Sequence, residues 1–71
     1  MDRNAKSVIY NWYASNENGE EFTRAETGKH GVTRIKYHEP AGEGDRHYCD
    51  IYEESGYFRV FNLCCVDLAN E

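Results

Sequence analysis

Short segments in which apolar and polar residues alternate follow one another along the chain, separated by turns rich in glycine and acidic residues. The pattern covers residues 8–14, 20–27, 32–39, 46–53 and 57–68. Alternation with a period of two in β-branched and aromatic residues is typical of half-buried β-strands. The pattern predicts a mainly β protein, with a single antiparallel five-stranded meander sheet, strongly curled, forming one domain over residues 1–71.

The segment 20–27 has two interpretations. Asn18-Gly19 just before it favours a type I′ turn, because both residues tolerate positive φ, and the segment would then return as the second strand. Alternatively, Phe22 and Ala25 are spaced as on one face of a helix, and early acidic residues suit a helix N-terminus. We favour the strand because of the turn, and keep one short helix near residues 20–27 as the alternative.

The middle and last strands make further predictions. Ile35 is expected opposite Ile51, which places Lys36 opposite Asp50 as a favourable pair of opposite charges. The last strand, residues 57–68, is apolar on both of its faces. We therefore expect a central strand that is covered on both sides, by the curled sheet or by a second molecule.

Composition indicates a fold with a small core. Leu, Ile, Val and Phe number only 12, a share that in a strongly charged chain would suggest disorder. Six Tyr, three Phe and one Trp reverse that expectation, because aromatic side chains bury large areas. A chain of 71 residues buries only about 60% of its unfolded surface and has little room for a deep cleft.

Charge and cysteine usage restrict the partners and the compartment. Thirteen Asp and Glu against eight Lys and Arg give a net charge of −5, so we expect no direct nucleic-acid binding and no membrane binding. Residues 1–7 are polar and predict no signal peptide. Three cysteines cannot all pair within one chain, and adjacent Cys64 and Cys65 would point to opposite faces of a strand. These features predict reduced thiols and a cytoplasmic protein.

No residue pattern indicates catalysis or metal binding. The three Cys and three His could supply a nucleophile and a base, but nothing in their spacing fixes a shared geometry, and His38 and His47 fall on opposite faces. His47-x-Cys49 lacks the paired spacing of structural zinc sites. We therefore predict no enzymatic activity, no catalytic residue, no metal and no cofactor.

Acidic residues cluster at the predicted hairpin ends. They are Glu17, Glu20 and Glu21 at the first, Glu39, Glu43 and Asp45 at the second, and Asp50, Glu53 and Glu54 at the third. Carboxylates at such positions could bind a basic groove as phosphates do, with fast and salt-sensitive association. The alternative is that these turns are acidic only because they are solvated.

With these acidic ends, its short length and its tyrosine-rich strands, the chain resembles small phage-encoded inhibitors of the anti-CRISPR type. Several of those proteins are compact acidic domains that occlude a nucleic-acid-binding groove. The likeness is one of size, charge and composition, and no family motif is matched. It implies a non-enzymatic inhibitor that occupies a basic surface of a larger host-defence complex, such as a CRISPR effector, in the host cytoplasm. The alternative is a small structural or adaptor subunit that forms a homodimer through its last strand.

Overall fold

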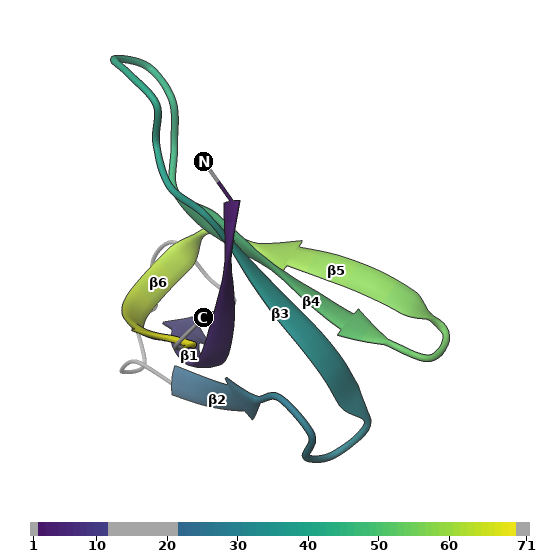
Figure 1. Cartoon of the computed structure of the whole chain (residues 1–71). Helices are drawn as coiled ribbons and strands as arrows, with labels where there is room; N and C mark the ends of the chain where they lie inside the picture. Colours follow the sequence, from purple (N-terminus) through teal and green to yellow (C-terminus); the bar gives the residue numbers. More distant parts are fainter. Residues whose placement is uncertain (1, 12–21, 70–71) are drawn as a thin grey trace.

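The computed structural model describes residues 2–11 and 22–69 (Figure 1). These residues form one six-stranded sheet in which all paired strands are antiparallel. None of the described residues is helical. The strands are β1 (Asp2–Asn11), β2 (Phe22–Glu26), β3 (Val32–His38), β4 (Tyr48–Glu53), β5 (Gly56–Val60) and β6 (Asn62–Leu68). The predicted antiparallel β fold is confirmed.

Two of the predicted elements are wrong. The short helix considered for residues 20–27 is not found, because Phe22–Glu26 pairs with β1 along its whole length as strand β2. The last segment is two strands rather than one, because Phe61 lies outside both and separates β5 from β6. The predicted Asn18-Gly19 turn lies outside the described residues.

The sheet is not a meander, because β1 lies at its centre. The strand order is β2-β1-β3-β4-β5, and β6 also pairs with β1. Ala5 lies opposite Ile35 of β3 and Leu68 of β6, whereas Val8 lies opposite β2 and β6. Since a strand has two hydrogen-bonding edges, β2 and β3 share one edge of β1 and β6 takes the other.

Between β2 and β3 the chain leaves the edge of β1 in a tight turn. Gly28, His30 and Gly31 in this turn have φ of 87°, 54° and 83°. Glycine adopts such values without steric cost, and His is one of the few other residues that does so at all often. The turn lets β3 pair with β4 while it still reaches the first residues of β1.

The sheet is neither strongly curled nor closed, which corrects the predicted curl. Among the described residues β5 hydrogen bonds to β4 alone, and β6 to β1 alone. The last segment is therefore not a central strand covered on both sides. At Phe61 the chain turns from the edge of β4 to the edge of β1, and this break changes which side chains face inward: Val60 is buried, and Leu63 packs against the core after it.

The core lies on one side of β3 and β4 and is mostly aliphatic. Its least exposed side chains belong to Val8, Ile35, Cys49 and Ile51. Tyr10 is also buried, and its ring approaches that of Phe58, with 6.4 Å between centroids. The prediction that aromatic residues supply the core thus holds for few of them, and most other described tyrosines lie on the opposite side of the sheet.

The predicted register between β3 and β4 is confirmed. Ile35 lies opposite Ile51, and Lys36 lies opposite Asp50. The ion pairs are made with other partners, however. Lys36 approaches Asp2 of β1, with 3.4 Å from Nζ to Oδ2, and Asp50 binds Arg59 of β5. The two charges therefore belong to two separate ion pairs, one that joins β3 to β1 and one that joins β4 to β5.

Candidate binding surface

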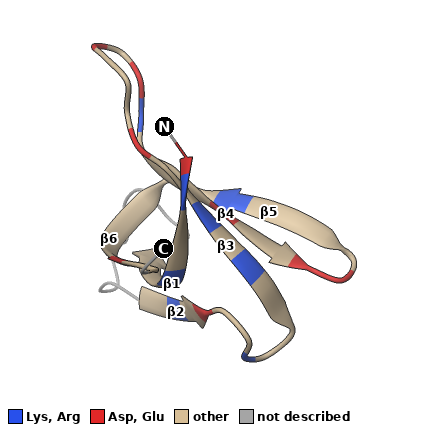
Figure 2. Cartoon of the chain, viewed as in Figure 1, with Lys and Arg blue, Asp and Glu red and all other residues tan. Residues whose placement is uncertain are grey.

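Alternation along three neighbouring strands places polar and aromatic side chains on the side of the sheet that faces away from the core. We call this set the outer face. It consists of Arg34, Lys36 and His38 of β3, Tyr48, Asp50 and Tyr52 of β4, Tyr57 and Arg59 of β5, and Phe61 just after β5. Figure 2 shows the basic positions on β3 and β5, and acidic residues at both ends of β4.

The first row of the outer face is a stack of rings and a guanidinium. The rings of His38 and Tyr48 are nearly parallel, with centroids 4.5 Å apart and 13° between their planes. The guanidinium of Arg59 lies 3.9 Å from the centroid of the Tyr48 ring. Phe61 is tilted against Tyr48 at 5.6 Å, and Arg46 lies 4.7 Å from the Phe61 ring. These are cation–π and aromatic contacts between cross-strand neighbours, which stabilise a sheet.

A second row repeats the arrangement four residues along β3 and β4. Arg34, Tyr52 and Tyr57 are register partners on β3, β4 and β5. The two tyrosine rings stack at 5.1 Å, and the Arg34 guanidinium lies 5.8 Å from the Tyr52 ring. Tyr57 is 58% exposed at the outer strand. The row therefore ends in a large solvent-accessible ring.

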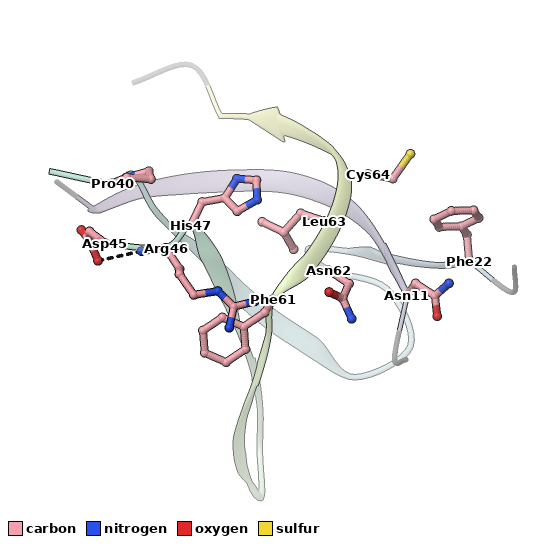
Figure 3. A pocket seen from close by; sticks show the side chains of 10 residues that line it. All are labelled: Asn11, Phe22, Pro40, Asp45, Arg46, His47, Phe61, Asn62, Leu63 and Cys64. Atoms are coloured by element: carbon pink, nitrogen blue, oxygen red, sulfur yellow. Dashed lines mark hydrogen bonds between the residues drawn. The ribbon is translucent and has the colours of Figure 1, made fainter. Parts of the chain in front are cut away.

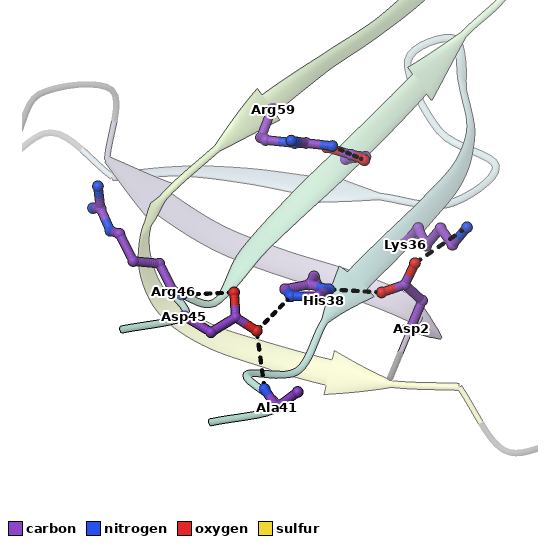
Figure 4. Close-up of polar contacts among 8 residues, drawn as sticks. Asp2, Lys36, His38, Ala41, Asp45, Arg46 and Arg59 are labelled. Carbon is purple, nitrogen blue, oxygen red and sulfur yellow. Dashed lines mark hydrogen bonds and ion pairs between the residues drawn. The ribbon is translucent and has the colours of Figure 1, made fainter. Parts of the chain in front are cut away.

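Between the rows, Arg59, which is labelled in Figure 4, covers and pairs with Asp50. Arg59 donates from Nε to Oδ1 of Asp50 at 2.7 Å and from Nη2 to Oδ2 at 3.0 Å. The hydrogen bonds to Asp50 raise the pKa of Arg59 above its already high usual value. The planar guanidinium and the carboxylate form a bidentate pair, which is the geometry that makes such pairs strong.

His38 also joins the outer face to β1 and to the connection between β3 and β4. Its Nδ1 lies 2.8 Å from Oδ1 of Asp2, and its Nε2 lies 3.0 Å from Oδ2 of Asp45 (Figure 4). Hydrogen bonds to Asp2 and then to Asp45 raise the pKa of His38 above 6.5. The same bond to His38 is the largest cause that lowers the pKa of Asp2.

Asp45 lies within the connection between β3 and β4 and stabilises it through hydrogen bonds to the backbone. Its carboxylate accepts hydrogen bonds from the backbone N–H of Ala41 at 2.9 Å and of Arg46 at 3.0 Å. The bond from Ala41 is the largest cause that lowers the pKa of Asp45, followed by the bond to His38. Asp45 is thus a structural residue of this connection as well as an acidic one.

The acidic residues predicted to bind a partner are distributed rather than gathered. Glu17, Glu20 and Glu21 lie outside the described residues. Glu39, Glu43 and Asp45 lie between β3 and β4, whereas Glu53 and Glu54 lie at the other end of β4 (Figure 2). Asp50 is only 7% exposed. The exposed carboxylates of Glu39, Glu43, Glu53 and Glu54 remain the part of the prediction that a partner could reach.

An open groove of about 730 Å³ adjoins the outer face (Figure 3). Phe61 belongs to both, Arg46 beside it also lines the groove, and Phe22 and Leu63 give the groove apolar walls. Phe22 and Phe61 are 47% and 39% exposed, which is high for phenylalanine. The groove extends the contact area available beside the first row.

The three cysteines differ in their exposure to solvent. Cys49 is fully buried, and burial, with a smaller contribution from Asp50, raises the pKa of its thiol to about 12. Cys64 and Cys65 are exposed on β6, and all three thiols are free. Within residues 2–11 and 22–69 no three His, Cys, Asp or Glu side chains lie close enough together to hold a metal ion. The same residues contain no helix that could span a membrane.

Sequence reasoning assigned the tyrosines mainly to the core and did not predict that three of them stack with each other or with basic side chains on one side of the sheet. The signal was present, because Arg34, Lys36 and His38 alternate with apolar positions, as do Tyr48, Asp50 and Tyr52. Comparison with protein-family models, curated proteins and solved structures found no match. The function therefore has to be argued from the surface itself.

Proposed function

We propose that this protein is a non-enzymatic inhibitor that binds a larger protein complex through its outer face. The observation that carries the proposal is the pair of stacked rows built from Tyr48, Tyr52, Tyr57 and Arg59. Tyrosine and arginine are enriched among the residues that dominate binding energy at protein interfaces. Because these side chains are already stacked in the free protein, little of their conformational entropy remains to be lost on binding.

The exposed acidic residues at the two ends of β4 define the partner class. Glu39 and Glu43 lie at one end, and Glu53 and Glu54 at the other. Carboxylates at the rim of an interface increase the association rate with a basic partner and make it dependent on salt. The overall size and charge resemble those of anti-CRISPR proteins, so the basic nucleic-acid-binding surface of a CRISPR effector is the partner that we propose to test first.

Binding of the purified protein to purified effector complexes, measured by biolayer interferometry, tests this function. We expect Tyr57→Ala to weaken binding roughly tenfold or more, as for a hot-spot residue, while Tyr57→Phe retains most of the affinity. Glu53→Lys with Glu54→Lys should slow association at about 50 mM salt and have less effect at about 500 mM, where charges are screened. Asp67→Lys on β6 is the matched control and should leave the rate unchanged.

Nucleic acid is the competing ligand for the same face, because Arg34, Lys36, Arg46 and Arg59 are interleaved with aromatic rings there. A labelled single-stranded oligonucleotide is therefore included in the experiment. We expect no binding to it at physiological salt. If the oligonucleotide binds and Tyr57→Ala abolishes that binding, the face is a nucleic-acid site and the inhibitor proposal is wrong.

A second candidate function, a structural subunit that dimerises through β6, is favoured by one observation. Among the described residues β6 pairs with β1 on one edge only, which leaves the backbone of Asn62–Leu68 available on the other. Such edges pair readily with another chain. Sedimentation equilibrium would then give a dimer that persists at high salt and that Cys64→Lys converts to a monomer. A monomer at all concentrations would exclude this function.

A further inference from the structure

The two ring nitrogens of His38 each face a carboxylate oxygen. The distances are 2.8 Å to Asp2 and 3.0 Å to Asp45, both within hydrogen-bond range (Figure 4). An ionised carboxylate can only accept, and a neutral imidazole has a single N–H to donate. Both bonds can therefore form together only when His38 is the imidazolium cation. The geometry of this site is that of the protonated state.

The groups around His38 come from five parts of the fold. Asp2 on β1 and Asp45 before β4 supply negative charge in direct contact. Lys36, on the same strand, is paired with Asp2, and Tyr48 on β4 stacks on the imidazole ring. The Arg59 guanidinium of β5 lies on the Tyr48 ring and is neutralised by its own pair with Asp50. The two contacting carboxylates thus dominate the electrostatic environment of the ring.

The His38–Asp45 bond fastens the base of a projecting segment. The chain between β3 and β4 extends away from the sheet in Figure 1, and it carries Glu39 and Glu43. Asp45 holds this segment through the N–H groups of Ala41 and Arg46, while His38 holds Asp45. Loss of the bond to His38 would release that base from β3.

The same bond also positions part of the outer face. Arg46 follows Asp45 directly, and its guanidinium lies 4.7 Å from the Phe61 ring. Phe61 in turn contacts Tyr48, on which His38 stacks. The bonded ring of His38 is therefore part of a closed set of contacts that includes the base of the connection and the first row.

We propose that His38 is a pH-controlled clamp that fixes the connection between β3 and β4 to the outer face and so regulates partner binding. The regulatory step rests on the proposed function, whereas the clamp itself is a property of the free protein. When His38 loses its proton, one of the two carboxylates no longer receives a hydrogen bond. The neutral ring can donate to Asp2 or to Asp45 but not to both, so the bond to Asp45 is broken for part of the time, and the connection that carries Glu43 and Arg46 is held less firmly.

The direction of the pH effect follows from the two kinds of group. The clamp is complete when His38 is charged and both aspartates are ionised. Because the pKa of His38 is raised above 6.5, the clamp persists above that pH and is lost as the pH rises through the raised pKa. Because the pKa values of Asp2 and Asp45 are lowered from 3.8, they stay ionised in mildly acidic solution.

The clamp is tested by two-dimensional NMR of the free protein between about pH 4.5 and about pH 9, a range that includes the usual pKa of histidine. We expect the His38 ring signals to titrate with a midpoint above 6.5, and the amide signals of Ala41 and Arg46 to shift with the same midpoint. Asp45→Asn should lower the midpoint and uncouple both amides. His30→Asn, in the exposed turn after β2, is the matched control and should leave the coupled titration intact.

Partner binding measured at about pH 6 and about pH 8.5, on either side of the titration of His38, tests the regulation. We expect affinity to be several-fold higher at the lower pH, and the difference to disappear in His38→Gln. A His38 midpoint at or below 6.5, or amides that do not follow it, would overturn the clamp whether or not a partner is found. A partner that binds equally at both pH values would overturn the regulation and leave the proposed function standing.

Discussion

The pair between Asp50 and Arg59 allows a quantitative prediction, because its two members differ in burial. The Asp50 side chain is 9% exposed and the Arg59 side chain is 41% exposed. In Asp50→Ala the released guanidinium can reach water, which replaces part of what the two charge-assisted hydrogen bonds contributed. The loss in the free energy of unfolding is therefore about 1–2 kcal/mol. In Arg59→Met an apolar side chain of similar length still covers the Asp50 carboxylate, which therefore stays desolvated but loses its partner, at a cost of about 3 kcal/mol.

Thermal and urea unfolding of the two single variants and of the double variant measure the difference. For a domain of this size 1 kcal/mol shifts Tm by about 4–8 °C, so Asp50→Ala should lower Tm by roughly 5–15 °C, and Arg59→Met should lower it further. The double variant should be more stable than Arg59→Met alone, although it has lost both charged groups. Arg24→Ala, whose guanidinium lies 3.9 Å from Glu26 on the surface, is the control and should change Tm little. If Arg59→Met is no more harmful than Asp50→Ala, or the single effects simply add, the reasoning about the desolvated carboxylate is wrong.

Three further outcomes are expected. Stability contributed by the raised pKa of His38 is present below pH 6.5 and lost as the pH rises through that pKa, so Tm of the parent should fall more than that of His38→Gln between neutral and alkaline pH; parallel curves would contradict this. Titration with a thiol reagent should modify two of the three cysteines in the folded protein and Cys49 only after unfolding, because its pKa is about 12 and it is buried; rapid reaction of all three would show that the core opens. Ile51→Ala should cost about 2–5 kcal/mol, close to the whole stability of about 3–5 kcal/mol expected for a chain this short, so circular dichroism should show a largely unfolded protein, whereas Ile51→Val stays folded.

The local strands could be predicted because each has its own alternation, but their arrangement could not. The register of β3 and β4 follows from matching Ile35 with Ile51. The start of β1 at Asp2 was missed, because its first residues are polar and are held by partners far along the chain, namely β3 and the N–H of Ala69. The division at Phe61 was missed for a related reason, since the apolar alternation runs on through residues 57–68 while the hydrogen-bonding partner changes from β4 to β1.

Part of the candidate site could likewise be predicted from strand alternation, and part of it depends on how the strands are arranged. Which residues face outward on β3 and β4 follows from strand alternation and could be read from the sequence. The contact between His38 and Asp2 joins residues 36 positions apart, and it depends on the pairing of β1 with β3, which a meander would not produce. Acidic residues were overvalued as a class, because Asp50 and Asp45 bind groups of their own chain.

The outer face has both a structural and a binding role, and two of its tyrosines separate them. A chain with few aliphatic residues gains stability from cross-strand stacking, so Tyr48, packed between His38 and Arg59, stabilises the sheet as well as any complex. Tyr57 stacks on Tyr52 at the outer strand and is 58% exposed, so the fold depends on it less. If the face binds a partner, Tyr57→Ala should reduce affinity far more than it reduces Tm, whereas Tyr48→Ala should reduce both. If Tyr57→Ala lowers Tm as much as Tyr48→Ala and leaves affinity unchanged, the rows serve only to hold the sheet together.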